Sequence, residues 1–228
     1  MAKPERGITT AIRRAALFRP LAPVALARLA AGATRLDLPR GRQLCRGGER
    51  CPGLYIVASG RLMLSVGAPR GASKVIGLVG PGGHIGLGAT VLGAPQPVTA
   101  ESLADSTVLL IPREALLDSA AGSPELGLQL VAALSREVYA LTADIEAFSL
   151  HSGRERVTSY LLQTAAANGT RAREFALPAK KSIIASRLNL TPEYFSRMLH
   201  DLIAAGAIAV NGRQITILDS ARLRQRGA

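Results

Sequence analysis

The spacing of hydrophobic positions changes along the chain, and each change predicts a different kind of structure. Residues 12–31 carry apolar side chains at helical spacing, interrupted by Pro20 and Pro23, which predicts one or two short leading helices. From residue 36 to residue 111, short apolar runs alternate with glycine-containing turns, most clearly at 54–57, 61–66, 75–79 and 108–111. Short strands at such close, regular spacing predict an antiparallel β barrel or roll.

Residues 75–94 are apolar over about the length of a membrane span. The stretch nevertheless contains His84 and a Pro81-Gly82-Gly83 turn, so strands joined by a tight turn explain it better. The N-terminal region has neither a continuous apolar segment nor a small-residue cleavage site. We therefore expect no signal peptide, no membrane association and a cytoplasmic location.

After Pro124 the spacing becomes helical and stays so to about Leu150. Three β-branched residues stand seven apart, at the a positions of a heptad, and a Leu or Phe follows each of them by three, at the d positions. The a positions are Val131, Val138 and Ile145, and the d positions are Leu134, Leu141 and Phe148. This arrangement favours a parallel two-stranded coiled coil, so we expect a dimerisation helix over residues 124–150 and a homodimer. The alternative is a long helix packed on its own domain, which uses a similar stripe.

A second helical segment follows a short polar break at residues 149–154. Residues 156–167 have helical spacing, and Asn168-Gly169 is a suitable C-terminal cap. The break predicts a domain boundary near His151.

Residues 181–200 have the pattern of a helix-turn-helix. Such a motif needs a small residue where its two helices touch and a permissive residue in the turn, and Ala185 and Asn189 occupy these positions. Thr191 is a good N-cap for the second helix, with Pro192 at its first position. The apolar positions that would pack the two helices together are Ile184, Leu188, Leu190, Phe195 and Met198.

The second of these helices has a polar face suited to reading DNA bases. Glu193, Ser196 and Arg197 lie at i, i+3 and i+4, and His200 follows at i+7. Arg pairs with guanine, Glu accepts a hydrogen bond from cytosine, and Ser is versatile, so we expect the first three to read bases in the major groove. The alternative is an ordinary amphipathic helix with a solvated Glu–Arg pair.

A β-hairpin follows directly, with residues 208–210 and 213–217 as strands and Asn211-Gly212 as the turn. A helix-turn-helix followed by such a hairpin is a winged helix. We expect contacts to the DNA backbone from a set of polar and basic residues in this region. They are Lys180, Lys181, Ser182, Thr191, His200 and Arg213.

The charge of the chain favours a polyanionic partner. The formal net charge is +12, and residues 151–228 contribute twelve Lys or Arg against five Asp or Glu, which is +7 of that total. Nucleic acid is the first candidate and an anionic membrane surface the second, although a basic composition alone selects no partner. Hydrophobic residues make up 48% and charged residues 19%, which indicates folded domains.

The order of β roll, long helix and winged helix-turn-helix resembles the CRP/FNR family of bacterial regulators over nearly the whole chain. The matching segments are GGERCPGLYIVASGRLML in the roll, RVTSYLL after the break, and LNLTPEYFSRML with GRQITILD at the end. The resemblance implies an α+β protein with a cyclic-nucleotide-binding-like roll (a double-stranded β-helix or jelly roll) over residues 1–123. A dimerisation helix over 124–150 and a winged helix-turn-helix over 151–228 would follow it.

The recognition segment Glu193-Tyr194-Phe195-Ser196-Arg197 is similar to the E-x-x-S-R pattern of the FNR-type subgroup. In that subgroup the Glu, Ser and Arg read a TTGA-like half-site, and the resemblance gives these roles to Glu193, Ser196 and Arg197.

The effector pocket implied by the resemblance departs from that of the cyclic-nucleotide-binding members. Where those members have a Gly-Glu pair for the ribose, this chain has Gly86-Leu87-Gly88, with Leu87 in place of the Glu. Where they have an Arg-Ser pair for the phosphate, it has Val98-Thr99. The loss of a carboxylate and a guanidinium removes both polar partners, so we do not expect cyclic AMP to be the effector.

Three other inputs remain open. The first is a gas-sensing haem, because the chain is also similar to the Dnr-type nitric-oxide regulators; His84, His151 or His200 would have to bind it. The second is a thiol switch between Cys45 and Cys51, which flank a Gly-Gly turn. The third is a small apolar or anionic metabolite in the altered pocket. An iron–sulfur cluster of the family's kind needs four cysteines, and this chain has two.

We therefore expect a homodimeric regulator that reads a pseudo-palindromic site in double-stranded DNA, contacts RNA polymerase, and is controlled by an effector sensed in the roll. One alternative is a ligand-binding regulatory module whose winged domain binds protein. Another is a cupin-type enzyme, but the roll lacks the clustered metal ligands that such an enzyme needs. We expect no catalytic residue and no metal site.

Overall fold

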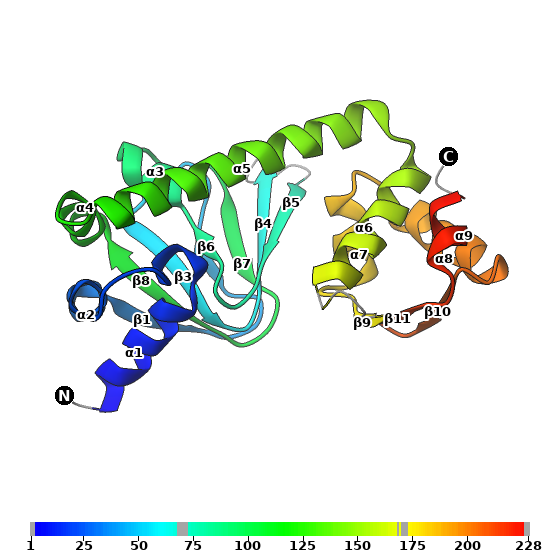
Figure 1. Cartoon of the computed structure of the whole chain (residues 1–228). Helices are drawn as coiled ribbons and strands as arrows, with labels where there is room; N and C mark the ends of the chain where they lie inside the picture. The colour runs from blue at the N-terminus through cyan, green and yellow to red at the C-terminus, as the bar shows by residue number, and fades with distance from the viewer. Residues whose placement is uncertain (1–2, 68–72, 168, 170–172, 226–228) are drawn as a thin grey trace. The chain divides into compact units, whose positions relative to one another are not determined.

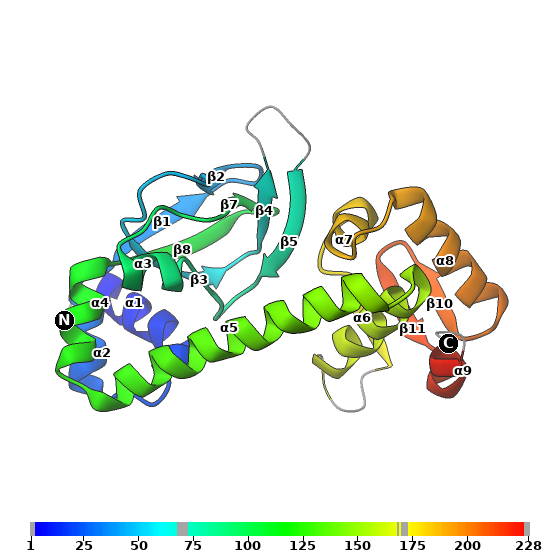
Figure 2. The same cartoon turned by 90° about the horizontal axis from the view of Figure 1, so that it is seen from above.

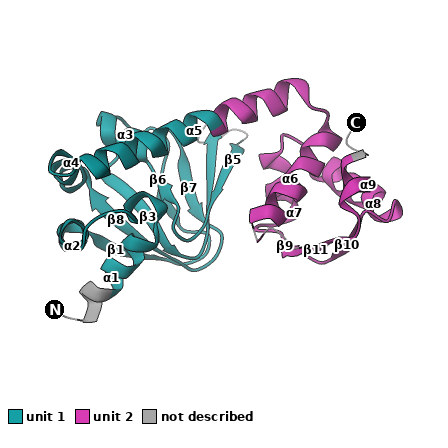
Figure 3. Ribbon diagram, viewed as in Figure 1, with its two compact units in different colours: residues 1–139 teal, residues 140–228 magenta. Residues whose placement is uncertain are grey.

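The computed structural model describes residues 3–67, 73–167, 169 and 173–225. The chain divides into two compact units, residues 1–139 and 140–228, which Figure 3 shows in different colours. The dividing point lies inside helix α5 (Pro124–Leu150), so this helix contributes residues to both units.

Unit 1 begins with α1 (Lys3–Arg14), the 3₁₀ turn η1 (Ala16–Phe18) and α2 (Pro23–Gly32). The prediction of short leading helices is confirmed, and Pro23 stands at the start of α2, where its missing N–H costs no hydrogen bond. The first helix begins at Lys3, earlier than the apolar spacing indicated, because its first two turns are mostly polar.

The rest of unit 1 is built on two antiparallel sheets. The strands are β1 (Thr34–Leu38), β2 (Gln43–Cys45), β3 (Gly53–Ser59), β4 (Leu62–Gly67), β5 (Ser73–Val79), β6 (His84–Ile85), β7 (Thr99–Ser102) and β8 (Ser106–Pro112). Within the described residues, the strand orders are β1-β8-β3-β6 and β2-β7-β4-β5, and Figures 1 and 2 show both sheets from two directions. The predicted β roll and its strands are confirmed.

Strand β3 is buried on both of its faces. Leu54 and Ile56 join the core formed with the helices, whereas Tyr55 and Val57 join a second core shared with residues of the other sheet. Because both faces are covered, the strand reads as a continuous apolar run instead of an alternating one.

The apolar stretch at residues 75–94 differs from the prediction in its second half. Strand β5 ends at Val79, and a turn closed by the Gly83 N–H donating to Gly80 O leads to the short strand β6. The chain then forms α3 (Leu87–Leu92), where a further strand was expected. Gly86 adopts a left-handed conformation (φ 83°) that turns the chain out of the sheet and into this helix.

Two longer helices complete unit 1. Helix α4 (Arg113–Ala121) was not predicted. Its first residue connects it to α3, because Arg113 Nε donates to Thr90 O of α3 (2.9 Å). Helix α5 confirms that residues 124–150 form one helix. Its first turns bury Leu126, Leu130 and Ala133 in the core of unit 1.

Unit 2 contains the end of α5 and the remaining elements. They are α6 (Gly153–Ala167), β9 (Glu174–Ala176), α7 (Lys181–Arg187), α8 (Pro192–Ala204), β10 (Ile208–Asn211), β11 (Gln214–Ile217) and α9 (Ser220–Gln225). The break after α5 is shorter than predicted, because a capping residue at Ser152 starts α6 at once. Strand β9 and helix α9 were not predicted, and β9 pairs with β11 to give the order β10-β11-β9. Asn168-Gly169 was the predicted cap at the end of α6. Gly169 has a positive φ (128°), and Asn168 lies outside the described residues.

Candidate nucleic-acid interface

The turn between α7 and α8 has the geometry that a helix-turn-helix requires. Ala185 is fully buried, and its carbonyl accepts the Leu190 N–H (2.9 Å) as the chain turns toward α8. Asn189 is the one non-glycine residue with a positive φ (57°) among the described residues. Asn tolerates this left-handed conformation better than most side chains, so the predicted turn is confirmed.

Helix α8 starts at the residue that the sequence predicted. The Thr191 hydroxyl accepts the Tyr194 N–H (3.2 Å), and Pro192 follows as the first helical residue. The inner face of the helix buries Phe195, Met198, Leu199 and Leu202. Burial of this face fixes which residues of α8 face outward.

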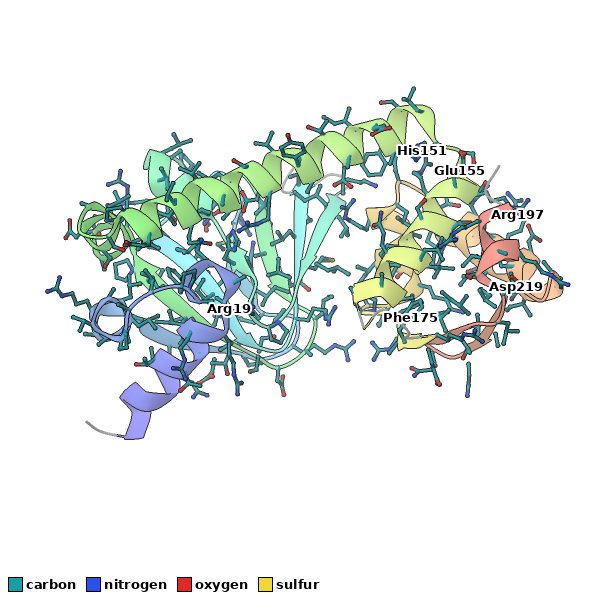
Figure 4. All side chains as sticks on the ribbon, in the orientation of Figure 1. Arg19, His151, Glu155, Phe175, Arg197 and Asp219 are labelled. Carbon is teal, nitrogen blue, oxygen red and sulfur yellow. The ribbon has the colours of Figure 1, made fainter. Side chains whose placement is uncertain are left out.

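The outward face of α8 carries the expected base-reading residues. Glu193, Arg197 and His200 are exposed, and Ser196 is half-buried. Figure 4 labels Arg197 on this helix. The structure therefore brings a carboxylate, a hydroxyl and a guanidinium onto one face within the first turns of a helix, as major-groove reading requires.

The sequence did not single out Tyr194, which lies next to these residues. The guanidinium carbon of Arg197 lies 5.0 Å from the centre of the Tyr194 ring, which is a cation–π contact. An aromatic residue three positions before an Arg on a helix was the available signal, because side chains at i and i+3 are neighbours.

The hairpin after α8 is present, but its turn lies one residue later than predicted. Asn211 pairs with Gln214, so the two loop residues are Gly212 and Arg213. Gly212 has a positive φ (60°) and Arg213 does not, as in a type II′ turn with Gly at its first loop position. This register places the exposed Arg213 at the tip of the wing.

The other residues expected to contact the DNA backbone lie at the starts of the two helices. Lys180 is the N-cap of α7, and Lys181 and Ser182 are its first two residues. Lys180 and Ser182 are exposed, and Lys181 is half-buried. The exposed Thr191 already uses its hydroxyl to cap α8.

Polar contacts hold α7 and the turn against the end of α5 and the start of α6. Arg187 of α7 forms an ion pair through Nη2 with both carboxylate oxygens of Asp144 on α5 (2.7 and 2.9 Å). Arg156 donates from Nη1 to His151 O (2.8 Å) and from Nη2 to Asn189 O (3.4 Å). A cavity of about 340 Å³ lies beside these contacts. The orientation of the helix-turn-helix within unit 2 thus depends on charged side chains as well as on its core.

The first turn of α6 is fixed by a capping box. The Ser152 hydroxyl accepts the Glu155 N–H (3.2 Å), and the Glu155 carboxylate accepts the Ser152 N–H. Hydrogen bonds from the Ser152 side chain and from the Ser152 N–H to the carboxylate hold the pKa of Glu155 below its usual value. His151 and Glu155 are labelled at this junction in Figure 4.

The residues expected in a dimer interface fall into two groups on α5. Val131, Val138, Leu141 and Ile145 are 61%, 61%, 57% and 66% exposed, which is unusual for apolar side chains at heptad spacing. Leu134 and Phe148 are half-buried, and Leu134 packs against the core of unit 1.

Most of the residues expected in the effector pocket take part in the packing, hydrogen bonds and helix start of the roll itself. Leu87 is buried in the core of unit 1, and Val98 packs on the core between the sheets. The Thr99 hydroxyl accepts the Gly47 N–H (3.0 Å). Gly86 caps α3, and Gly88 is its second residue. These five residues offer no carboxylate and no guanidinium.

The two cysteines are free and buried. Burial raises the pKa of the Cys45 thiol to about 11. The Cys51 thiol lies in a buried polar cluster, where it accepts a hydrogen bond from Gln96 Nε2 (3.0 Å) and lies 3.4 Å from Thr90 Oγ1. A high pKa leaves little thiolate at neutral pH, which lowers the reactivity of Cys45.

His84 connects the roll to α5. Its Nε2 atom lies 2.9 Å from a carboxylate oxygen of Glu137, within hydrogen-bond distance. The other two histidines lie in unit 2, where His151 lines the cavity and His200 is exposed on α8. Among the described residues, no three His, Cys, Asp or Glu side chains are grouped as metal ligands. No helix in the described part of the chain is long and apolar enough to cross a membrane.

Comparisons with known proteins agree with this architecture. Residues 35–121 match the cyclic nucleotide-binding domain, and residues 155–226 match the Crp-like helix-turn-helix domain. The CRP-like cAMP-activated global transcriptional regulator of Mycobacterium tuberculosis is 27% identical over 218 residues, which cover 94% of this chain and 97% of that protein. The fumarate and nitrate reduction regulatory protein of Escherichia coli is 29% identical over 191 residues, which cover 82% and 76%. The solved structure of FixK2 from Bradyrhizobium japonicum, 25% identical, covers 86% of this chain and 98% of that one with a TM-score of 0.78.

Proposed function

Because the chain belongs to the CRP/FNR family of transcription regulators, we propose that it is a cytoplasmic homodimer that reads a pseudo-palindromic DNA site. The proposed organisation is an effector-sensing roll over residues 1–123, a dimerisation helix over 124–150 and a DNA-binding domain over 151–228. The proposed partners are double-stranded DNA, a second copy of the chain and RNA polymerase.

The observation that carries the proposal is the outward face of α8. Glu193, Ser196 and Arg197 share that face, while the opposite face is buried and the helix start is capped. We propose that these three residues read an FNR-like half-site. The backbone contacts proposed for Lys180, Lys181, Ser182, Thr191, His200 and Arg213 would position α8 without reading sequence.

Substitution of Arg197 tests base reading directly. Arg197→Ala is expected to cost about 1–3 kcal/mol on the duplex that the wild-type protein selects from a random pool, and to relax discrimination at one base pair. Arg224→Ala on α9 is the matched control, because it removes the same charge from an exposed site outside the helix-turn-helix. Fluorescence anisotropy at several salt concentrations measures both affinities. Equal weakening on the selected duplex and on random DNA would show that Arg197 contacts only the backbone.

The exposed apolar residues of α5 support the proposed homodimer. A second copy would remove Val131, Val138, Leu141 and Ile145 from water, and their heptad spacing suits a helix of the same kind as partner. Val138→Asp is expected to produce monomers in light scattering. Tyr139→Asp lies on the same helix but at neither an a nor a d position, so it should leave the molecular mass in solution unchanged. A monomeric wild-type protein at micromolar concentration would refute the dimer.

The proposed control of DNA binding starts in the roll. The contact between His84 and Glu137 supports this route, because it joins a strand of the roll to the dimerisation helix. The effector is proposed to be other than cyclic AMP, because Leu87 and Val98 replace the polar groups that such a ligand needs. The visible spectrum and the native mass of the purified protein distinguish haem, a bound metabolite and a thiol-based input.

A further inference from the structure

The reading side chain Arg197 is exposed, and a long exposed side chain has many rotamers. We propose that Tyr194 is a positioning residue that holds the Arg197 guanidinium in one orientation before DNA is bound. We also infer that Gly153, at the start of α6, is the surface on which the Tyr194 ring rests. This inference depends on the proposed role of Arg197 in base reading.

The stacking of Arg197 on Tyr194 is the first observation. The guanidinium carbon lies 5.0 Å from the centre of the ring, and the two residues are three apart on α8. A planar guanidinium stacks well on an aromatic face and keeps its N–H donors free at the edge. Stacking therefore restricts Arg197 without using the donors that guanine needs, and pre-organisation of this kind lowers the entropic cost of binding.

The support of the Tyr194 ring by α6 is the second, independent observation. A Cβ atom at Gly153 would lie 2.7 Å from Tyr194 Cε1 and 2.9 Å from Cζ and Oη. Real contacts are never so close, so the ring lies directly against a backbone that only glycine leaves open. The capping box of Ser152 and Glu155 fixes that backbone. Tyr194 is thus placed between a rigid helix start and Arg197.

The arrangement links the reading residue to the junction that follows α5. Helix α5 ends at Leu150, and Gly153 begins α6. A change in the first turn of α6 would move the Tyr194 ring, and the ring would carry the guanidinium of Arg197 with it. Tyr194 and Gly153 would then determine how sharply one base pair is read, whereas affinity for DNA in general would depend on the backbone contacts.

The test measures discrimination at the base pair that Arg197 reads. The probes are the duplex selected by the wild-type protein, the same duplex with that base pair replaced, and random DNA. Tyr194→Ala is expected to lower the ratio of the two sequence-specific affinities about two- to fivefold, with unchanged affinity for random DNA. Tyr194→Phe keeps the ring and should retain the wild-type ratio. Gly153→Ala changes no residue of α8. It should lower the same ratio, because the new Cβ would displace the Tyr194 ring.

A double-mutant cycle identifies the mechanism. If Tyr194 acts through Arg197, Tyr194→Ala has no further effect on the ratio in an Arg197→Ala background. An additional loss in that background, or a loss in Tyr194→Phe equal to that in Tyr194→Ala, would show that Tyr194 contacts DNA itself and would overturn the inference. An unchanged ratio in both Tyr194→Ala and Gly153→Ala would also overturn it. These outcomes would leave the proposed function intact. If no variant lost discrimination, not even Arg197→Ala, both this inference and the proposed function would be refuted.

Discussion

The left-handed backbone of Asn189 gives a quantitative test of the turn that orients α8. Asn189 has a φ of 57° and an exposed side chain, so Asn189→Val loses no buried contact and changes mainly the cost of that conformation. The left-handed region costs an ordinary L-residue about 1–2 kcal/mol, and a β-branched residue is among the least suited to it. A domain of 60–100 residues melts about 4–8 °C lower for each kcal/mol lost, so the expected fall in Tm for unit 2 is about 4–16 °C.

Asn189→Gly is the matched control, because glycine adopts this conformation without a steric penalty and should stay within about 0.5 kcal/mol of wild type. Circular dichroism gives the melting transition, and hydrogen exchange of peptides that cover residues 181–204 assigns it to the helix-turn-helix. The Arg156 contact is made to the Asn189 carbonyl, so both substitutions retain it. Equal stability of the Val and Gly variants would refute a left-handed turn at this position.

Three further predictions concern other parts of the chain. Gly86→Ala should cost about 1–3 kcal/mol more in urea unfolding than Gly41→Ala. Both glycines have a positive φ (83° and 80°). A Cβ at Gly86 would lie 2.4 Å from Gln96 Nε2, whereas a Cβ at Gly41 would meet no atom within 4 Å. Equal costs of the two substitutions would contradict this packing. Cys45 should react with iodoacetamide at pH 8 far more slowly in the native than in the unfolded protein, because its pKa is raised to about 11, and mass spectrometry of the labelled peptide measures the rate. The N–H groups of Arg222 and Ala221 donate to Asp219 and lower its pKa below the usual 3.8, so its stabilising effect is complete above about pH 4 and lost as the pH falls through the folded-state pKa. Asp219→Asn should flatten that dependence in acid titrations of the melting temperature, and an unchanged profile would exclude the cap as its source.

The parts of the fold that could be predicted are those in which local preference and burial agree. Strand β3 is a continuous apolar run because both of its faces are covered, and α8 begins where Thr191 and Pro192 favour a helix start. Helix α3 could not be predicted, because its apolar, glycine-rich sequence also fits a strand and the left-handed Gly86 decides between them. Strand β9 has three residues, too few for any periodicity.

The residues of the candidate site also divide into those that could be predicted from the sequence and those that could not. The outward face of Glu193, Ser196 and Arg197 follows from helical spacing alone. The position of Arg213 required the strand register, because pairing of Asn211 with Gln214 moved the turn by one residue. The i, i+3 spacing of Tyr194 and Arg197 was available in the sequence, but the closeness of the Tyr194 ring to Gly153, which lies in another helix, was not. Contacts between elements distant in sequence leave no periodic signal.

Helix α5 has a consequence for how the protein unfolds. The helix is about 40 Å long at 1.5 Å per residue, and it contributes buried residues to unit 1 and an ion-paired Asp144 to unit 2. A partner that covers its exposed apolar residues would therefore stabilise both units through one element. By mass action, the two units should melt in one cooperative transition at high protein concentration and in separate transitions on dilution. The cooperativity of this chain would then be a property of the assembly, set by protein concentration as much as by sequence.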